Sequence, residues 1–66
     1  MGAGGIVNDR AALLLTVLNS PSYLNFMEDS DKTRVGEIAA KGALACDAGD
    51  VRYMGALVDH INKNTP

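Results

Sequence analysis

The stretch DKTRVGEIAAKGALACDAGDVRYMGALVDHINK, residues 31–63, decides the fold. Apolar side chains recur through it at three- and four-residue spacing, which is typical of amphipathic helices. The pattern breaks once, at Ala48-Gly49-Asp50, where Gly49 can end one helix in the left-handed conformation and Asp50 can cap the next. So short a turn predicts that the second helix folds back on the first as an antiparallel hairpin.

The two helices of this predicted hairpin differ in the size of their apolar side chains. The first presents a face of mostly small residues, made of Val35, Ile38, Ala39, Gly42, Ala45 and Cys46. The second has a regular stripe of larger residues, made of Val51, Met54, Leu57, Val58 and Ile61. Leu44 lies opposite the first face, which favours a second apolar contact across a dimer.

The chain before residue 31 is expected to pack against the hairpin. Three of the first five residues are Gly, so residues 1–7 are predicted to be a flexible leader and 8–66 a single helical domain. Asn8 or Asp9 would cap the first helix. Pro21 follows a good capping residue and predicts either a second helix over 21–27 or a kink in one longer helix.

The first helix has no clear polar face. Its apolar residues cover nearly the whole circumference, so the helix should be buried on several sides or contribute to a subunit interface. The leucines that form the predicted interface are Leu13, Leu14, Leu15 and Leu18, together with Leu44.

Length and composition narrow the possible classes of protein. A chain of 66 residues forms one small, marginally stable domain, and its single Cys and single His exclude an internal disulfide and an all-protein zinc site. Oligomerisation is therefore the expected source of extra stability. The formal net charge of -2 gives no reason to expect binding along a nucleic-acid backbone. No apolar run approaches a membrane span, so a cytoplasmic location is expected.

One short cluster has the composition of an anion site. Lys32, Thr33 and Arg34 stand in the first turn of a predicted helix, where free amides favour anions, and Tyr53 or Tyr23 could stack on a nucleotide base. The competing interpretation is that the two cations pair on the surface with their acidic neighbours, which are Glu28, Asp29 and Asp31.

Catalysis, a cofactor and a metal are not expected. Asp59 and His60 are adjacent in a helix and therefore point in different directions. Cys46 occupies an apolar face and is interpreted as a structural buried thiol.

The sequence therefore predicts an all-α protein of three to four short helices, completed by oligomerisation, that is not an enzyme. Its expected function is a noncatalytic interaction module that self-associates and acts as an adaptor or inhibitor of another protein. Contact would use an apolar helical face with an acidic rim that includes Asp29, Asp31 and Asp47. The alternative is a small-ligand binder that holds a nucleotide or another anion between its helices.

Overall fold

The computed structural model describes the backbone of residues 3–64 and the side chains of residues 8–64. This part of the chain is all-helical, which confirms the predicted class. The elements are α1 (Ala3–Leu18), α2 (Pro21–Leu24), α3 (Asp29–Lys41), a 3-10 turn η1 (Ala43–Ala45) and α4 (Ala48–Asn64).

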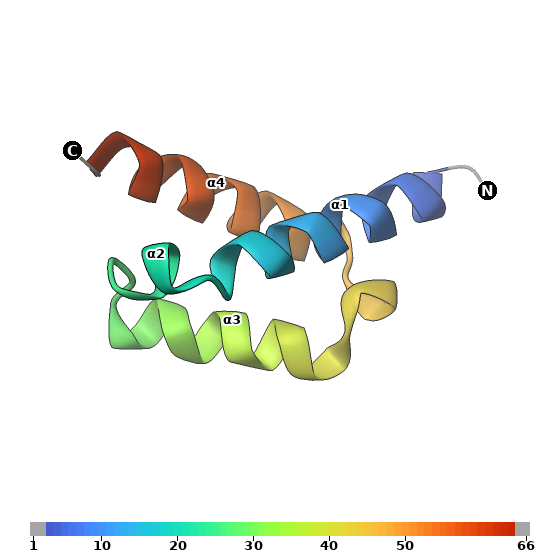
Figure 1. Ribbon diagram of the computed structural model, residues 1–66. Coiled ribbons are helices and arrows are strands. Elements are labelled where there is room, and N and C mark those ends of the chain that lie inside the picture. Colours follow the sequence, from blue (N-terminus) through green and yellow to red (C-terminus); the bar gives the residue numbers. More distant parts are fainter. Residues whose placement is uncertain (1–2, 65–66) are drawn as a thin grey trace.

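Helix α1 is the centre of the arrangement. It contacts α2, α3, η1 and α4, and its most extensive packing is along α4. Figure 1 shows α3 and α4 running in opposite directions, with α1 lying against them. The predicted hairpin is not confirmed, because α4 packs mainly on α1 rather than on α3, its neighbour in the chain.

The core is formed by one apolar stripe from each of the three long helices, together with Met27 and Cys46 from the connections between them. Leu18 of α1 and Met54 of α4 are completely covered. The predicted stripe of α4 is confirmed, with Val58 the one member that is only half-buried. The buried apolar residues are Ala11, Leu14, Leu18, Met27, Val35, Ile38, Cys46, Val51, Met54, Leu57 and Ile61.

The break between the last two helices falls at Gly42, not at Gly49. Gly42 has φ +90°, a left-handed conformation that an L side chain rarely adopts, and its amide still donates to the carbonyl of Ile38 at 3.1 Å. Gly49 lies inside α4. The prediction was wrong because local propensity allows a helix as far as Asp47, whereas burying the stripe of α4 against α1 requires an earlier turn.

A reciprocal pair of hydrogen bonds opens α4. The amide of Asp50 donates to Oδ1 of Asp47 at 2.8 Å, and the amide of Asp47 donates to Oδ2 of Asp50 at 3.4 Å. This is the geometry of a capping box, in which the first residue caps the helix and the fourth returns the bond. Asp47 is therefore the cap, and the prediction that Asp50 fills this role was wrong.

The N-terminal half also differs from the prediction. Helix α1 begins at Ala3, so Asn8 and Asp9 lie within it and cap nothing. Of the predicted flexible leader, residues 1–2 lie outside the described residues and residues 3–7 belong to α1. Ser20 is extended, with φ -75° and ψ 148°, so the segment forms two helices rather than one kinked helix. Helix α2 ends at Leu24, before the predicted limit.

Candidate functional site

Two residues of the predicted anion site meet in the structure. The guanidinium of Arg34, on α3, lies 4.4 Å from the ring centre of Tyr53, on α4. This is a cation–π contact between the two helices. The hydroxyl of Tyr53 donates to Oδ1 of Asp31 at 2.8 Å, so a carboxylate occupies the polar end of the same ring.

The carboxylate of Asp31 weakens this place as an anion site. Burial of the ring, then the hydrogen bond to Asp31 and the charge of Asp31, raise the pKa of Tyr53 to about 12. The phenol is therefore neutral and engaged at neutral pH. An anion bound at Arg34 would face the negative charge of Asp31, which opposes binding.

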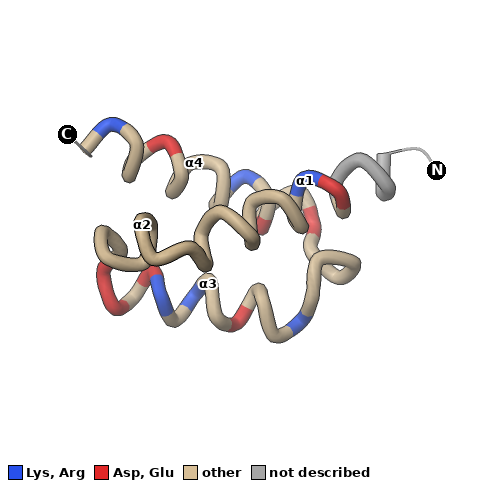
Figure 2. The backbone as a smooth tube through the Cα atoms, in the orientation of Figure 1, with Lys and Arg blue, Asp and Glu red and all other residues tan. Residues whose placement is uncertain are grey.

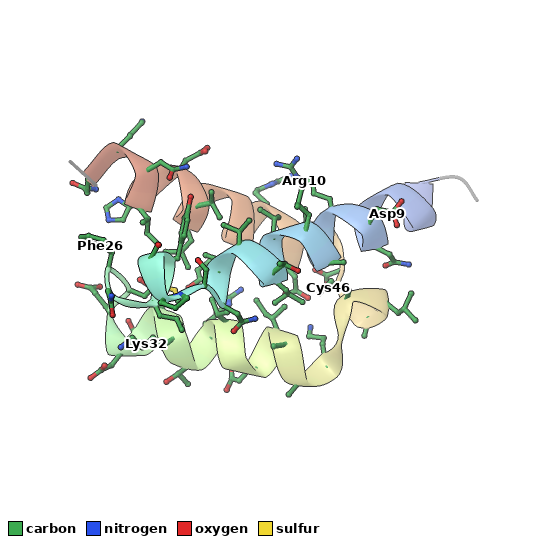
Figure 3. All side chains as sticks on the ribbon, viewed as in Figure 1. Asp9, Arg10, Phe26, Lys32 and Cys46 are labelled. Carbon is green, nitrogen blue, oxygen red and sulfur yellow. The ribbon has the colours of Figure 1, made fainter. Side chains whose placement is uncertain are left out.

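Lys32 and Thr33 do not join this group. The hydroxyl of Thr33 donates to the carbonyl of Asp29 at 3.0 Å. Lys32 is exposed at the start of α3 (Figure 3), and residues two apart on a helix point to nearly opposite sides, so it diverges from Arg34. The predicted surface pairing is not observed either, because the one salt bridge found within residues 8–64 joins Lys41 to Asp50.

This Lys41–Asp50 pair ties the end of α3 to the start of α4. Nζ of Lys41 donates to Oδ2 of Asp50 at 2.7 Å. Asp50 is 8% exposed and is the one charged residue of the described chain that is buried. The hydrogen bond from Lys41 lowers the pKa of Asp50, and the bond to Asp50 raises the pKa of Lys41. Each partner favours the charged form of the other.

Cys46 and His60 have local structural contacts. The thiol of Cys46 is buried, lies 3.5 Å from the carbonyl of Gly42, and has a pKa raised above its usual value, chiefly by burial. The predicted burial of this thiol is therefore confirmed. His60 is exposed, and the side-chain amide of Asn64 donates to its backbone carbonyl at 2.8 Å and lies 3.4 Å from Nδ1 of its ring. Within the described chain no three His, Cys, Asp or Glu side chains are placed to hold a metal.

The predicted interface leucines divide into two groups. Leu14 and Leu18 have 8% and 0% exposure and belong to the core of their own chain, and Leu15 is half-buried. Leu14 and Leu18 are therefore core residues, contrary to their assignment to an interface, because α1 is wrapped by the other helices. Leu13 and Leu44 are 63% and 85% exposed, so these two remain available to a partner.

Sequence reasoning missed a larger feature around Leu13. No Asp, Glu, Lys or Arg occurs between Arg10 and Glu28, and Figure 2 shows this part of α1 and all of α2 without charge. We name the exposed residues of this segment the uncharged surface. Counting charges along the sequence would have revealed it. Its members are Ala12, Leu13, Thr16, Asn19, Pro21, Ser22, Asn25 and Phe26.

Phe26 is the second large apolar member of the uncharged surface. It is 50% exposed in the connection between α2 and α3 (Figure 3). Charged residues limit the surface at both ends, with Asp9 and Arg10 on α1 and Glu28 before α3.

Comparison with known proteins gives no further indication of function. No protein-family model, no curated protein and no solved structure matches the chain. None of the helices described is both long enough and apolar enough to span a membrane.

Proposed function

We propose that this protein is a noncatalytic interaction module that self-associates and acts in the cytoplasm as an adaptor or inhibitor of another protein. The observation that carries the proposal is the uncharged surface of α1, α2 and the start of the connection to α3. It displays Leu13 and Phe26 to solvent in a chain in which 21% of the residues are charged.

The physical argument rests on the cost of desolvating charges. The centre of a protein interface is depleted in charged residues, because a buried charge needs a partner, whereas apolar and neutral polar groups lose little on leaving water. The uncharged surface satisfies this condition along two consecutive helices. Covering Leu13 and Phe26 would add the favourable burial of two large side chains.

The acidic rim of the proposed contact is smaller than the sequence suggests. Asp31 accepts the hydroxyl of Tyr53, and Asp47 caps α4, so both carboxylates support the fold. Glu28 and Asp29 are exposed where the uncharged surface ends. They are the acidic groups best placed to attract a basic partner and to speed its association.

A charge placed within the uncharged surface tests the proposal. Leu13→Lys adds a lysine where the side chain is already 63% exposed, so the fold should tolerate it. Ala56→Lys adds the same charge at an exposed position of α4 and is the matched control. In capture experiments from the native source, Leu13→Lys should reduce recovery of the specific partner about tenfold, the loss expected when a central contact is removed.

Circular dichroism would first establish that both variants keep the helical content of the parent. If Leu13→Lys and Ala56→Lys then retained the same proteins in the same amounts, the uncharged surface would have no role in recognition. If Ala56→Lys alone lost the partner, the contact would lie on α4 instead.

A second candidate function is the binding of a nucleotide or another anion beside Arg34. It is favoured by the position of the Arg34 guanidinium over Tyr53 and opposed by Asp31. A thermal-shift panel of nucleotides and inorganic phosphate tests it, because a ligand at 100 times its Kd stabilises the folded state by about 2.7 kcal/mol. Arg34→Ala should abolish any such shift and Lys32→Ala should not. A panel without shifts would eliminate this candidate.

A further inference from the structure

The attachment of α4 to the rest of the molecule depends mainly on α1 and less on its covalent neighbour α3. Helix α4 packs most extensively along α1. Its contacts with α3 are made by side chains, including the salt bridge between Lys41 and Asp50 and the hydrogen bond between Asp31 and Tyr53. All of these contacts would be equally good if α4 came from a second copy of the chain.

The linker between α3 and α4 combines a glycine of positive φ with an exposed leucine. Gly42 has φ +90° and Leu44 is 85% exposed, the greatest exposure of any large apolar residue described. The residues that follow Gly42 are Ala43-Leu44-Ala45, which are strong helix formers held here in a short 3-10 turn. The linker therefore holds a left-handed glycine and an uncovered leucine, two features that a continuous helix would remove.

A continuous helix would also change the surroundings of Leu44. Leu44 stands four residues after Ala40 and seven before Val51, so all three would lie on one stripe. The apolar stripe of α4 would then extend back through the linker. Two such helices crossing at a twofold axis would bring their Leu44 side chains together and cover them.

We propose that two copies of this chain exchange α4, with α3, the linker and α4 joined into one helix. Each α1 then receives the α4 of the other copy, and the two Leu44 side chains pack at the crossing. This proposal rests on the self-association included in the proposed function and names its mechanism. The uncharged surface stays outward, so the dimer presents it twice.

Opposing contributions set the balance between the two forms. The monomer keeps the capping box of Asp47 and Asp50. The exchanged dimer loses this cap and places Gly42 inside a helix, which is unfavourable for glycine, but it covers Leu44. Because association follows mass action, the dimer fraction should increase with protein concentration.

Gly42→Ala is the first test, with Gly36→Ala as its matched control. A Cβ added at either position has nothing within 4 Å, so the two substitutions differ in backbone conformation rather than in packing. Alanine disfavours φ +90° in both copies, so Gly42→Ala should lower the dimer Kd roughly 30-fold. Gly36→Ala, inside α3, should leave it unchanged. Light scattering over a concentration series measures the Kd.

The second test asks which copy supplies α4. Lys41→Asp and Asp50→Lys each place like charges at the junction of α3 and α4. In a chain that keeps its own α4, mixing the two variants cannot repair either junction. After exchange, every junction of the mixed dimer joins opposite charges. The variants are unfolded and refolded together, and native mass spectrometry should show the mixed dimer in large excess over both homodimers.

Each result has a distinct meaning. A mixed dimer in excess supports the exchange. Dimers of the parent chain and of Gly42→Ala without preference for the mixed species would overturn the exchange and leave self-association by another surface. If both chains stayed monomeric at every concentration, the exchange and the self-association in the proposed function would be overturned together. Partner capture by the uncharged surface would be judged separately by Leu13→Lys.

Discussion

Asp50 has two roles at the residue scale, and both use the same carboxylate. Its Oδ2 accepts from Nζ of Lys41 at 2.7 Å and lies 3.4 Å from the amide of Asp47. These partners make burial of a charged group tolerable, because a buried charge must be paired and hydrogen-bonded. The spacing of the two aspartates is visible in the sequence. The pairing with Lys41 depends on the turn at Gly42 and is not.

The Lys41–Asp50 pair predicts a dependence of stability on pH. Asp50 has a pKa below 3.8 in the folded state, so its contribution is present above pH 3.8 and is lost as pH falls through the folded pKa. Lys41 has a pKa above 10.5, so its contribution is present below pH 10.5 and is lost as pH rises. Urea unfolding at a series of pH values should show smaller acid destabilisation for Asp50→Asn than for the parent. Parallel curves would contradict the prediction.

Tyr53 should ionise late in an alkaline titration. Its pKa of about 12 lies above the ordinary 10.0, so the neutral phenol stabilises the fold below pH 10 and this stabilisation is lost as pH rises toward 12. Ultraviolet absorbance of the phenolate should show a transition near pH 12 that Tyr53→Phe removes. Asp31→Asn should move it to lower pH, since it removes the charge that opposes ionisation. An unchanged midpoint in Asp31→Asn would leave burial as the sole cause.

At the scale of elements, the start of α4 shows how a local motif fixes a helix boundary. The run Asp47-Ala48-Gly49-Asp50 contains its own capping box, so the helix begins where the side-chain bonds allow. The end of α3 is different. Its position follows from the need to bring α4 back against α1, which no feature within α3 encodes.

Removing the cap should destabilise the protein by a predictable amount. Asp47→Ala is expected to cost about 1 kcal/mol in the free energy of unfolding, and Asp47→Ser should recover most of it. Asp9→Ala is the control, because Asp9 lies within α1 and caps no helix. Chemical denaturation measures all three. An equal loss in Asp47→Ala and Asp9→Ala would show that the bonds at Asp47 contribute nothing specific.

The order of the helices could be predicted from the sequence, but their exact boundaries could not. Pro21 after Ser20 marks the start of α2, since proline fits the first turn of a helix. Sequence could not tell whether α1 and α2 were one helix, because that depends on the extended backbone at Ser20. It also placed the start of α1 too late, at Asn8 or Asp9, because capping residues can equally lie inside a helix.

At the scale of the whole molecule, one chain covers about as much of its surface as a monomer of this length is expected to cover. The accessible area is 4342 Å², close to the about 4,000 Å² expected for a monomeric protein of 6.9 kDa. Leu14 and Leu18 are buried in the core. What remains uncovered is local, at Leu13, Phe26 and Leu44, so the proposed partner would cover these side chains rather than complete the core.

Two leucines of α1 give a direct test of this division. Leu18→Ala should cost about 2–5 kcal/mol, because it leaves a cavity in the core, and Leu13→Ala should change stability by less than about 0.5 kcal/mol. The free energies come from chemical denaturation of dilute protein, where association is minimal. Similar losses at both positions would mean that Leu13 is also covered in the folded state.

The sequence by itself determined the helical class, the apolar stripe of α4 and the burial of Cys46, because each depends on the spacing of neighbouring residues. Tertiary structure alone decided which helix covers that stripe, which leucines are buried and where α3 ends. It also joined Arg34 to Tyr53 and Lys41 to Asp50, and left Lys32 and Thr33 apart. The physical reason is that burial against α1 outweighs the local preference to continue a helix, and the pairing of distant side chains follows from that choice.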